Sequence, residues 1–322
     1  MNKKKLLLGS AMGLGAALTG MTLSVGKKVF DGTFGSKPRI AADEMEAYYS
    51  QAKNHMMDRL KKYDQQKFMI ENSKNDYLIE TLHLKSPHNN QNVMVLVHGI
   101  KGNYYDLLPV AFRYLEDGYN VILYNQRQTG LTGGKDYSFG VYEKLDLDEV
   151  TLIARRLYPN GKLGVHGFSM GAATSAMHSE LNEKIKRVDF YILDAPYHTM
   201  ESTLDLALNE EKPPILPKKY IKWSGDLVLG MKNKIHYRDI EPLNAIKHAN
   251  VPILIIHGTA DKITDPEGSQ LLYEAIPHEN KRLIYFEGSA HCKAHKNHEE
   301  RYFKEIYSFI DEMNEKEQKI NN

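Results

Sequence analysis

The chain has 322 residues and a formal net charge of +1, with 42% hydrophobic and 26% charged residues. This balance is typical of an ordinary globular protein, and without clustered basic residues it gives no reason to expect a nucleic-acid partner. The single cysteine, Cys292, excludes an intrachain disulfide.

The N-terminus begins with the basic stretch MNKKK, which is followed by an uncharged segment from Leu6 to Gly26. A membrane-spanning helix needs about 20 apolar residues, so this segment is just long enough. It reads as an uncleaved anchor, as a cleaved signal peptide with Thr22-Leu23-Ser24 as its best cleavage site, or as a buried or loosely attached helix. We expect residues 1–26 to be a signal anchor or signal peptide that places the rest of the chain outside the cytoplasm, at the cell membrane or secreted after cleavage.

After this segment, residues 27–74 are expected to form a linker (27–40) and a surface helix (41–63). Strands and helices then alternate over residues 75–322. Strands are expected at 76–84, 93–99, 119–127, 162–167, 188–196, 251–258 and 281–288, and helices at 104–118, 142–159, 170–181 and 297–319. Such alternation is typical of an α/β fold with a mostly parallel, doubly wound sheet.

One interval, at about 197–250, breaks the alternation because it contains no convincing strand. Long insertions of this kind are usually functional, and we expect a small, mainly helical cap over one edge of the sheet. Trp223, Leu227, Leu229 and Met231 are candidates for an apolar lining of the cap, or for its own core.

The stretch GVHGFSMGAAT (164–174) contains the pattern G-x-S-x-G between an expected strand and an expected helix. In that context the serine occupies a sharp turn, and glycines on both sides let the strand and helix pass each other closely. The N-terminus of the helix directs unpaired N–H groups toward the hydroxyl. Ser169 is therefore the candidate nucleophile.

A serine nucleophile needs a base and an acid that orients the base, in the chain order Ser, acid, His for a sheet of this kind. Asp261 follows the expected strand 251–258, and His291 follows the last expected strand. Both lie at carboxyl ends of strands, where ligands bind in open α/β sheets. Asp265 and Asp194 remain rival acids.

The candidate base also has rivals, because His291, His295 and His298 form H-x3-H-x2-H. A metal site there is conceivable, but no H-E-x-x-H is present and we assign no metal or cofactor. Cys292 lies beside His291, and we interpret it as structural because its side chain should point away from the base.

Two backbone N–H groups are expected to form an oxyanion hole, the site that binds the negatively charged carbonyl oxygen of a tetrahedral intermediate. One is the N–H of Met170, at the start of the helix after Ser169. The other is the N–H of Ile100, in the loop VHGIKGN (97–103) after an earlier strand. A plain strand-to-helix turn is the alternative interpretation of that loop.

Together these residues resemble the α/β-hydrolase superfamily, and within it the bacterial serine aminopeptidase-like hydrolases that often carry an N-terminal membrane-spanning segment. The resemblance covers residues 75–315 and rests on LVHGIKGN, GVHGFSMGAAT, ILDAPY, HGTADKITDP and GSAHCKA. It implies that Ser169, Asp261 and His291 form a catalytic triad. The chain departs from the family pattern at NQRQTGLT, where Asn125 replaces an acidic residue and Thr132 a common serine.

The resemblance and the residues favour a serine hydrolase that cleaves a carboxylic ester, thioester or amide through an acyl-enzyme, without a cofactor. Its partners would be a small-molecule ester, thioester or peptide substrate and, through residues 1–26, a membrane. The alternatives are an acyltransferase with the same acyl-enzyme chemistry and a non-catalytic binding protein that retains the fold.

Overall fold

The computed structural model describes residues 3–35, 54–74, 76–88, 90–210 and 215–321. Its centre is an eight-stranded sheet with the strand order β1-β2-β4-β3-β5-β6-β7-β8. β1 and β2 pair antiparallel, as do β2 and β4, and all the other pairs are parallel. The predicted mostly parallel sheet is confirmed.

The strands are short, and those in the middle of the sheet are buried along their whole length. They are β1 (Gln65–Glu71), β2 (Leu78–Leu84), β3 (Val93–Val97), β4 (Asn120–Tyr124), β5 (Leu163–Phe168), β6 (Phe190–Asp194), β7 (Ile253–Gly258) and β8 (Lys281–Phe286). β1 was not expected, because its sequence QQKFMIE is largely polar and lies at the sheet edge, where only Phe68 and Ile70 pack against the apolar core.

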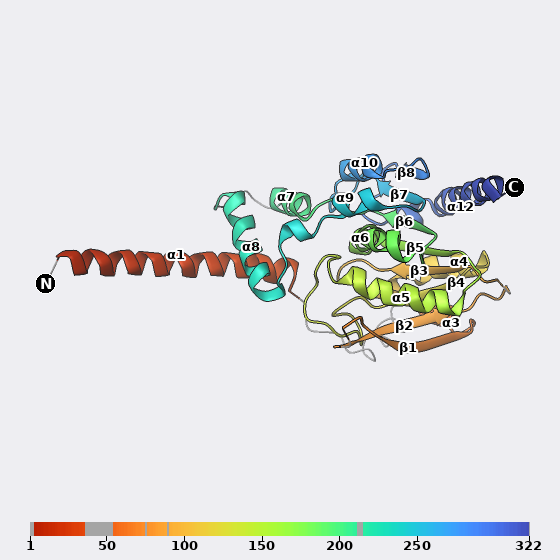
Figure 1. Cartoon of the computed structure of the whole chain (residues 1–322), viewed down its shortest axis with the longest axis horizontal. Coiled ribbons are helices and arrows are strands. Elements are labelled where there is room, and N and C mark those ends of the chain that lie inside the picture. Colours follow the sequence, from red (N-terminus) through yellow and green to blue (C-terminus); the bar gives the residue numbers. More distant parts are fainter. Residues whose placement is uncertain (1–2, 36–53, 75, 89, 211–214, 322) are drawn as a thin grey trace.

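Helices cover both faces of this sheet (Figure 1). Successive side chains of a strand point to opposite faces, so Met94 and Leu96 join one apolar cluster while Val93, Val95 and Val97 join the other. The first cluster includes α3 (Asn54–Leu60), α4 (Leu108–Glu116) and α12 (Glu299–Asn321). The second includes α5 (Glu143–Leu157), α6 (Met170–Ile185) and α10 (Pro266–Ala275).

The N-terminal segment forms one long helix, α1 (Lys3–Thr33), which extends away from the sheet in Figure 1. The linker predicted to begin at residue 27 is therefore wrong up to Thr33, and residues 36–53 lie outside the described chain. No helix in the described ranges is long and apolar enough to cross a membrane.

The last turns of α1 pack against α8 (Lys218–Asn233). Gly26 lies so close to the Ser224 carbonyl that a Cβ atom would clash there, and a glycine permits the two helices to touch. Phe30 and Phe34 are 2% and 0% exposed in one apolar cluster with Leu229. The end of α1 is thus part of the folded core.

The interval 197–250 contains α7 (Met200–Glu210) and α8, followed by short turns and α9 (Pro242–Ala245). Of the four apolar candidates in α8, Leu229 is buried in the cluster with α1. Trp223, Leu227 and Met231 are 55%, 37% and 58% exposed and form a ridge on the opposite side of the helix. Their exposure excludes all three from the core of the cap, and Trp223 lines a hollow whose other walls are mostly polar.

Candidate active site

Ser169 occupies a tight turn between β5 and α6, with φ 55° and ψ −118°. Such a backbone conformation is strained for a residue with a Cβ atom and persists only where the surroundings impose it. Gly171 lies against the Val97 carbonyl, and Gly167 lies against the Gly171 carbonyl, so a Cβ at either position would clash. Both glycines are therefore required by close packing, as their positions in the sequence predict.

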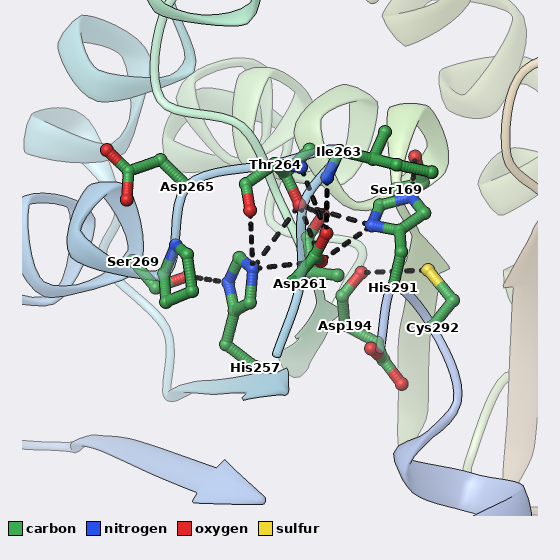
Figure 2. Close-up of polar contacts among 12 residues, drawn as sticks. Ser169, Asp194, His257, Asp261, Ile263, Thr264, Asp265, Ser269, His291 and Cys292 are labelled. Atoms are coloured by element: carbon green, nitrogen blue, oxygen red, sulfur yellow. Dashed lines mark hydrogen bonds and ion pairs between the residues drawn. The ribbon is translucent and has the colours of Figure 1, made fainter. Parts of the chain in front are cut away.

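The hydroxyl of Ser169 begins a chain of hydrogen bonds that runs through His291 to Asp261 (Figure 2). Ser169 Oγ lies 2.8 Å from His291 Nε2, and His291 Nδ1 lies 2.7 Å from Asp261 Oδ2. The three residues come from the ends of β5, β7 and β8, and the parallel sheet places these ends at one edge. The structure thus brings together the three side chains selected from the sequence.

The carboxylate of Asp261 is fully buried and strongly hydrogen-bonded. Its Oδ1 accepts the backbone N–H groups of Ile263 and Thr264, at 2.8 and 3.1 Å. Burial alone would raise the pKa of Asp261, but hydrogen bonds from His257 and His291, together with the backbone N–H of Thr264, hold it well below its ordinary value. Asp261 is therefore ionised at neutral pH.

The two rival acids face elsewhere. Asp194 accepts a hydrogen bond of 2.7 Å from the Tyr302 hydroxyl, and burial raises the pKa of Asp194 to about 6. Its backbone carbonyl, not its carboxylate, faces the serine turn and accepts the Ser169 N–H at 2.8 Å. Asp265 caps the N-terminus of α10 and accepts the Glu267 N–H. Neither carboxylate contacts His291.

The rival histidines pack among aromatic rings. His295 contacts the rings of Phe168 and Tyr302, and burial lowers its pKa to about 4. His298 lies beside the Phe286 ring, 5.7 Å between centroids. Over the described residues, no group of three or more His, Cys, Asp or Glu side chains has the arrangement of a metal site.

Cys292 has a positive φ of 50°, and its Sγ lies 4.0 Å from the Asp194 carbonyl oxygen (Figure 2). Burial raises the pKa of the Cys292 thiol well above its usual value, so the thiolate that a nucleophile requires is disfavoured.

The loop after β3 passes directly beside the serine, since a Cβ on Gly99 would lie 3.2 Å from Ser169 Cβ and 3.8 Å from its Oγ. The next N–H in this loop belongs to Ile100, and Met170 supplies the first N–H of α6. Neither N–H has a hydrogen-bond acceptor within the ranges that the structure covers. Both groups flank the serine turn.

His98 fixes the peptide unit that carries the Ile100 N–H. Its Nε2 accepts the backbone N–H of Gln126 at 2.9 Å, so its ring proton lies on Nδ1, which donates to the Gly99 carbonyl at 2.7 Å. Burial lowers the pKa of His98 to about 4, which keeps the ring neutral. Because a peptide unit is planar, holding the Gly99 carbonyl also fixes the direction of the Ile100 N–H.

Comparison with known proteins agrees with this architecture. The family described as "alpha/beta hydrolase fold" matches residues 92–220, and the family described as "Serine aminopeptidase, S33" matches residues 240–296. The uncharacterized protein YqkD of Bacillus subtilis (strain 168) is 30% identical over 244 residues, which are 74% of this chain and 77% of YqkD. This chain belongs to the α/β-hydrolase family.

Solved structures of other α/β hydrolases share the fold. The Pyrococcus furiosus esterase Pf2001 superposes with a TM-score of 0.63 at 23% identity, over 78% of this chain and 93% of the esterase. The Pyrococcus horikoshii acylaminoacyl peptidase superposes with a TM-score of 0.57 at 17% identity, over 81% of this chain and 43% of the peptidase. As a member of this family, the protein is a hydrolase.

The departure from the family pattern at Asn125 has a local explanation. Glu80, on the neighbouring β2, is 6% exposed, and its Oε2 accepts the Asn125 side-chain amide and the Leu131 N–H, each at 2.8 Å. Asn125 Oδ1 in turn accepts the Tyr104 N–H at 2.9 Å. An aspartate at 125 would put a second carboxylate against Glu80, whereas an asparagine can both donate and accept.

His257 contacts Asp261 but was not selected from the sequence. It lies in β7, is 0% exposed, and its Nε2 is 3.1 Å from Asp261 Oδ2. The available signal was a histidine at the end of an otherwise apolar buried strand, ILIIHG, because a buried polar side chain requires a partner. His98 occupies the equivalent place after VMVLV and gives the same signal.

Proposed function

We propose that this hydrolase cleaves a carboxylic ester through an acyl-enzyme formed on Ser169. The observation that carries this proposal is the continuous hydrogen-bonded chain Ser169–His291–Asp261 at a strained strand-to-helix turn. Purely structural packing does not require a hydroxyl, an imidazole and an ionised carboxylate in this order.

In the first step, Ser169 Oγ attacks the carbonyl carbon of the ester and His291 Nε2 takes the hydroxyl proton. Asp261 holds the Nδ1–H tautomer of His291 and stabilises the imidazolium that forms. The N–H groups of Ile100 and Met170 donate to the oxyanion of the tetrahedral intermediate. His291 then gives its proton to the leaving alkoxide, and the acyl group remains on Ser169.

In the second step, His291 takes a proton from water, and the resulting hydroxide attacks the acyl-enzyme carbonyl. The tetrahedral intermediate collapses, the carboxylic acid leaves, and Ser169 Oγ recovers its proton from His291. Both steps balance with the ester and one water molecule as the reactants. An ester is the preferred substrate class because its leaving group needs less activation than that of an amide.

A serine-directed fluorophosphonate probe tests the nucleophile directly. We expect the folded wild-type protein to be labelled on Ser169, with no labelling of Ser169→Ala. A panel of p-nitrophenyl esters of increasing chain length should be hydrolysed by the wild type and lose at least about 10³-fold in kcat/KM in Ser169→Ala. Absence of labelling in folded protein would favour a binding protein that retains the fold.

Added alcohol separates a hydrolase from an acyltransferase. Both enzymes form the same acyl-enzyme, so both are labelled, but only an acyltransferase transfers most of the acyl group to a good acceptor alcohol. We expect free carboxylic acid as the main product at millimolar alcohol, measured by chromatography of the products.

A further inference from the structure

One carboxylate oxygen of Asp261 is shared by two histidines. Oδ2 lies 2.7 Å from His291 Nδ1 and 3.1 Å from His257 Nε2 (Figure 2). His291 is the base of the proposed mechanism. His257 is buried on the other side of Asp261, and its hydrogen-bond partners are Asp261, Thr264 and Ser269 rather than Ser169. The mechanism therefore leaves one of the two histidine–carboxylate contacts without a function.

The surroundings of His257 determine where its ring proton lies. Besides Asp261 Oδ2, its Nε2 has the Thr264 carbonyl oxygen and the Thr264 hydroxyl at 3.3 Å each. A carboxylate and a carbonyl can only accept hydrogen bonds, so Nε2 carries a proton and donates it. Asp261 Oδ2 is the nearest of these acceptors.

The other ring nitrogen of His257 meets a hydroxyl that can donate to it in this tautomer. Ser269 Oγ, in the first turns of α10, lies 2.6 Å from His257 Nδ1 and is 0% exposed. With the ring proton on Nε2, Nδ1 is an acceptor and the Ser269 hydroxyl donates to it. The direction of donation then runs from Ser269 through His257 to Asp261.

We propose that His257 and Ser269 are positioning residues for the catalytic acid, which they hold in place from the side opposite His291. This inference rests on the proposed function of Ser169, His291 and Asp261. His257 donates to the same oxygen that accepts from His291 and thereby does two things. It anchors the carboxylate, and it withdraws negative charge that would otherwise strengthen the hold of Asp261 on the His291 proton.

The second effect has a definite sign. Without the His257 donor, the Asp261 carboxylate is less stabilised and attracts the His291 proton more strongly, so the imidazolium is favoured. The acidic limb of the pH profile of kcat/KM reports the protonation of the free enzyme's base. Loss of His257 is therefore expected to move this limb to higher pH.

Other ionisable groups lie near this pair and enter the design of the test. Asp194, at the end of β6, interacts electrostatically with His257, His291 and Asp261, and burial raises its pKa to about 6. Cys292, beside His291, is held as a neutral thiol by burial. On the α10 side lie His198, which approaches Gly268, and Asp265, which interacts with His198.

The experiment compares His257→Phe with His257→Gln in the full chain. Phenylalanine keeps a planar ring but donates no hydrogen bond. We expect it to lower kcat/KM about tenfold or more and to move the midpoint of the acidic limb to higher pH by about 0.5 to 1 pH unit. Glutamine can donate from its amide, and we expect it to recover most of the activity and the wild-type limb. Ser269→Ala should shift the limb in the same direction by less.

Histidine ring resonances of isotopically labelled protein supply a readout independent of turnover, because the titration of His291 should move with the acidic limb. His178→Phe is the matched control, since His178 is also 0% exposed and bonded to a hydroxyl, that of Tyr191 at 2.7 Å, and lies outside the site. We expect this control to leave the limb in place. Comparison of Asp194→Asn with the wild type shows how much of the acidic limb comes from the titration of Asp194.

A limb that stays at its wild-type position in His257→Phe, with His291 titrating as before, would overturn the proposal. The same conclusion follows if His257→Gln loses as much activity as His257→Phe. If His257→Phe does not fold, Ser269→Ala decides the question by the presence or absence of the shift. Failure of wild-type labelling by fluorophosphonate would instead contradict the proposed function itself.

Discussion

Replacing Asp261 by asparagine gives the most direct test of which carboxylate is the acid. Asp261 Oδ1 accepts two backbone N–H groups, from Ile263 and Thr264, so in Asp261→Asn the amide oxygen must occupy that side. The amide NH₂ then replaces Oδ2, which lies 2.7 Å from His291 Nδ1. A donor now faces Nδ1, and the ring proton of His291 must move to Nε2.

That tautomer places an N–H against the Ser169 hydroxyl, where the mechanism needs a free nitrogen. Loss of the correct tautomer in a serine triad lowers kcat by about 10⁴-fold, which corresponds to about 5.5 kcal/mol of transition-state free energy. The carboxylate is fully buried, so no water can take the place of the lost acceptor. We therefore expect a loss of this order in Asp261→Asn.

The measurement is kcat for a p-nitrophenyl ester, together with circular dichroism to establish that the variant is folded. Asp265→Asn is the matched control, because Asp265 caps α10 and does not contact His291. We expect its activity to stay within about twofold of the wild type, since asparagine caps a helix N-terminus as well as aspartate does. Retention of more than a tenth of the activity in Asp261→Asn, or a comparable loss in Asp265→Asn, would refute the assignment of Asp261.

Three further predictions concern stability and are measured by chemical or thermal unfolding. Asn125→Asp puts a second carboxylate against the buried Glu80 and should lower the free energy of unfolding by about 3 kcal/mol; an unchanged value would contradict the explanation given for Asn125. Phe34→Ala empties a fully buried site between the end of α1 and the cap and should lower the free energy of unfolding by about 3–5 kcal/mol. The control Leu18→Ala, at a residue that is 57% exposed, should lower it by less than about 0.5 kcal/mol. Equal effects of the two variants would show that the end of α1 is not part of the core. Burial raises the pKa of Asp194 from 3.8 to about 6, so the folded protein binds this proton more tightly than the unfolded chain does. The free energy of unfolding therefore falls as pH rises through this range, by up to about 3 kcal/mol. Asp194→Asn should remove that fall between pH 4 and 6.5, and a variant with the wild-type pH dependence would disprove it.

Much of the site could be predicted from the sequence because its chemistry is tied to local patterns. The turn at Ser169 needs glycines at 167 and 171, and these stand in the sequence beside an apolar strand and a helix of small residues. The positions of Asp261 and His291 follow from the ends of the strands that precede them. Parallel strands bring such ends to one edge of a sheet, so order along the chain is enough to select the candidates.

The N-terminal segment illustrates the opposite case. Its length and flanking lysines predict an anchor or signal peptide over residues 1–26, and this stays a prediction. They give no sign that the chain packs against the cap at Gly26, Phe30 and Phe34. An apolar helix in a sequence has the same pattern whether its partner is lipid or another helix. The partner, α8, lies far along the chain, and nothing in residues 1–35 specifies it.

The sequence by itself determined the alternation of strands and helices and the serine turn, because both depend on backbone conformation and on burial of neighbouring residues. It left Asp261, Asp194 and Asp265 as competing acids, since all three follow or flank strand ends. Only the tertiary structure decided among them, by directing Asp194 to Tyr302 and Asp261 to His291. It also placed His257 and Ser269 behind the carboxylate. The physical reason is that side-chain direction and hydrogen-bond partners depend on contacts between distant segments, which no local pattern encodes.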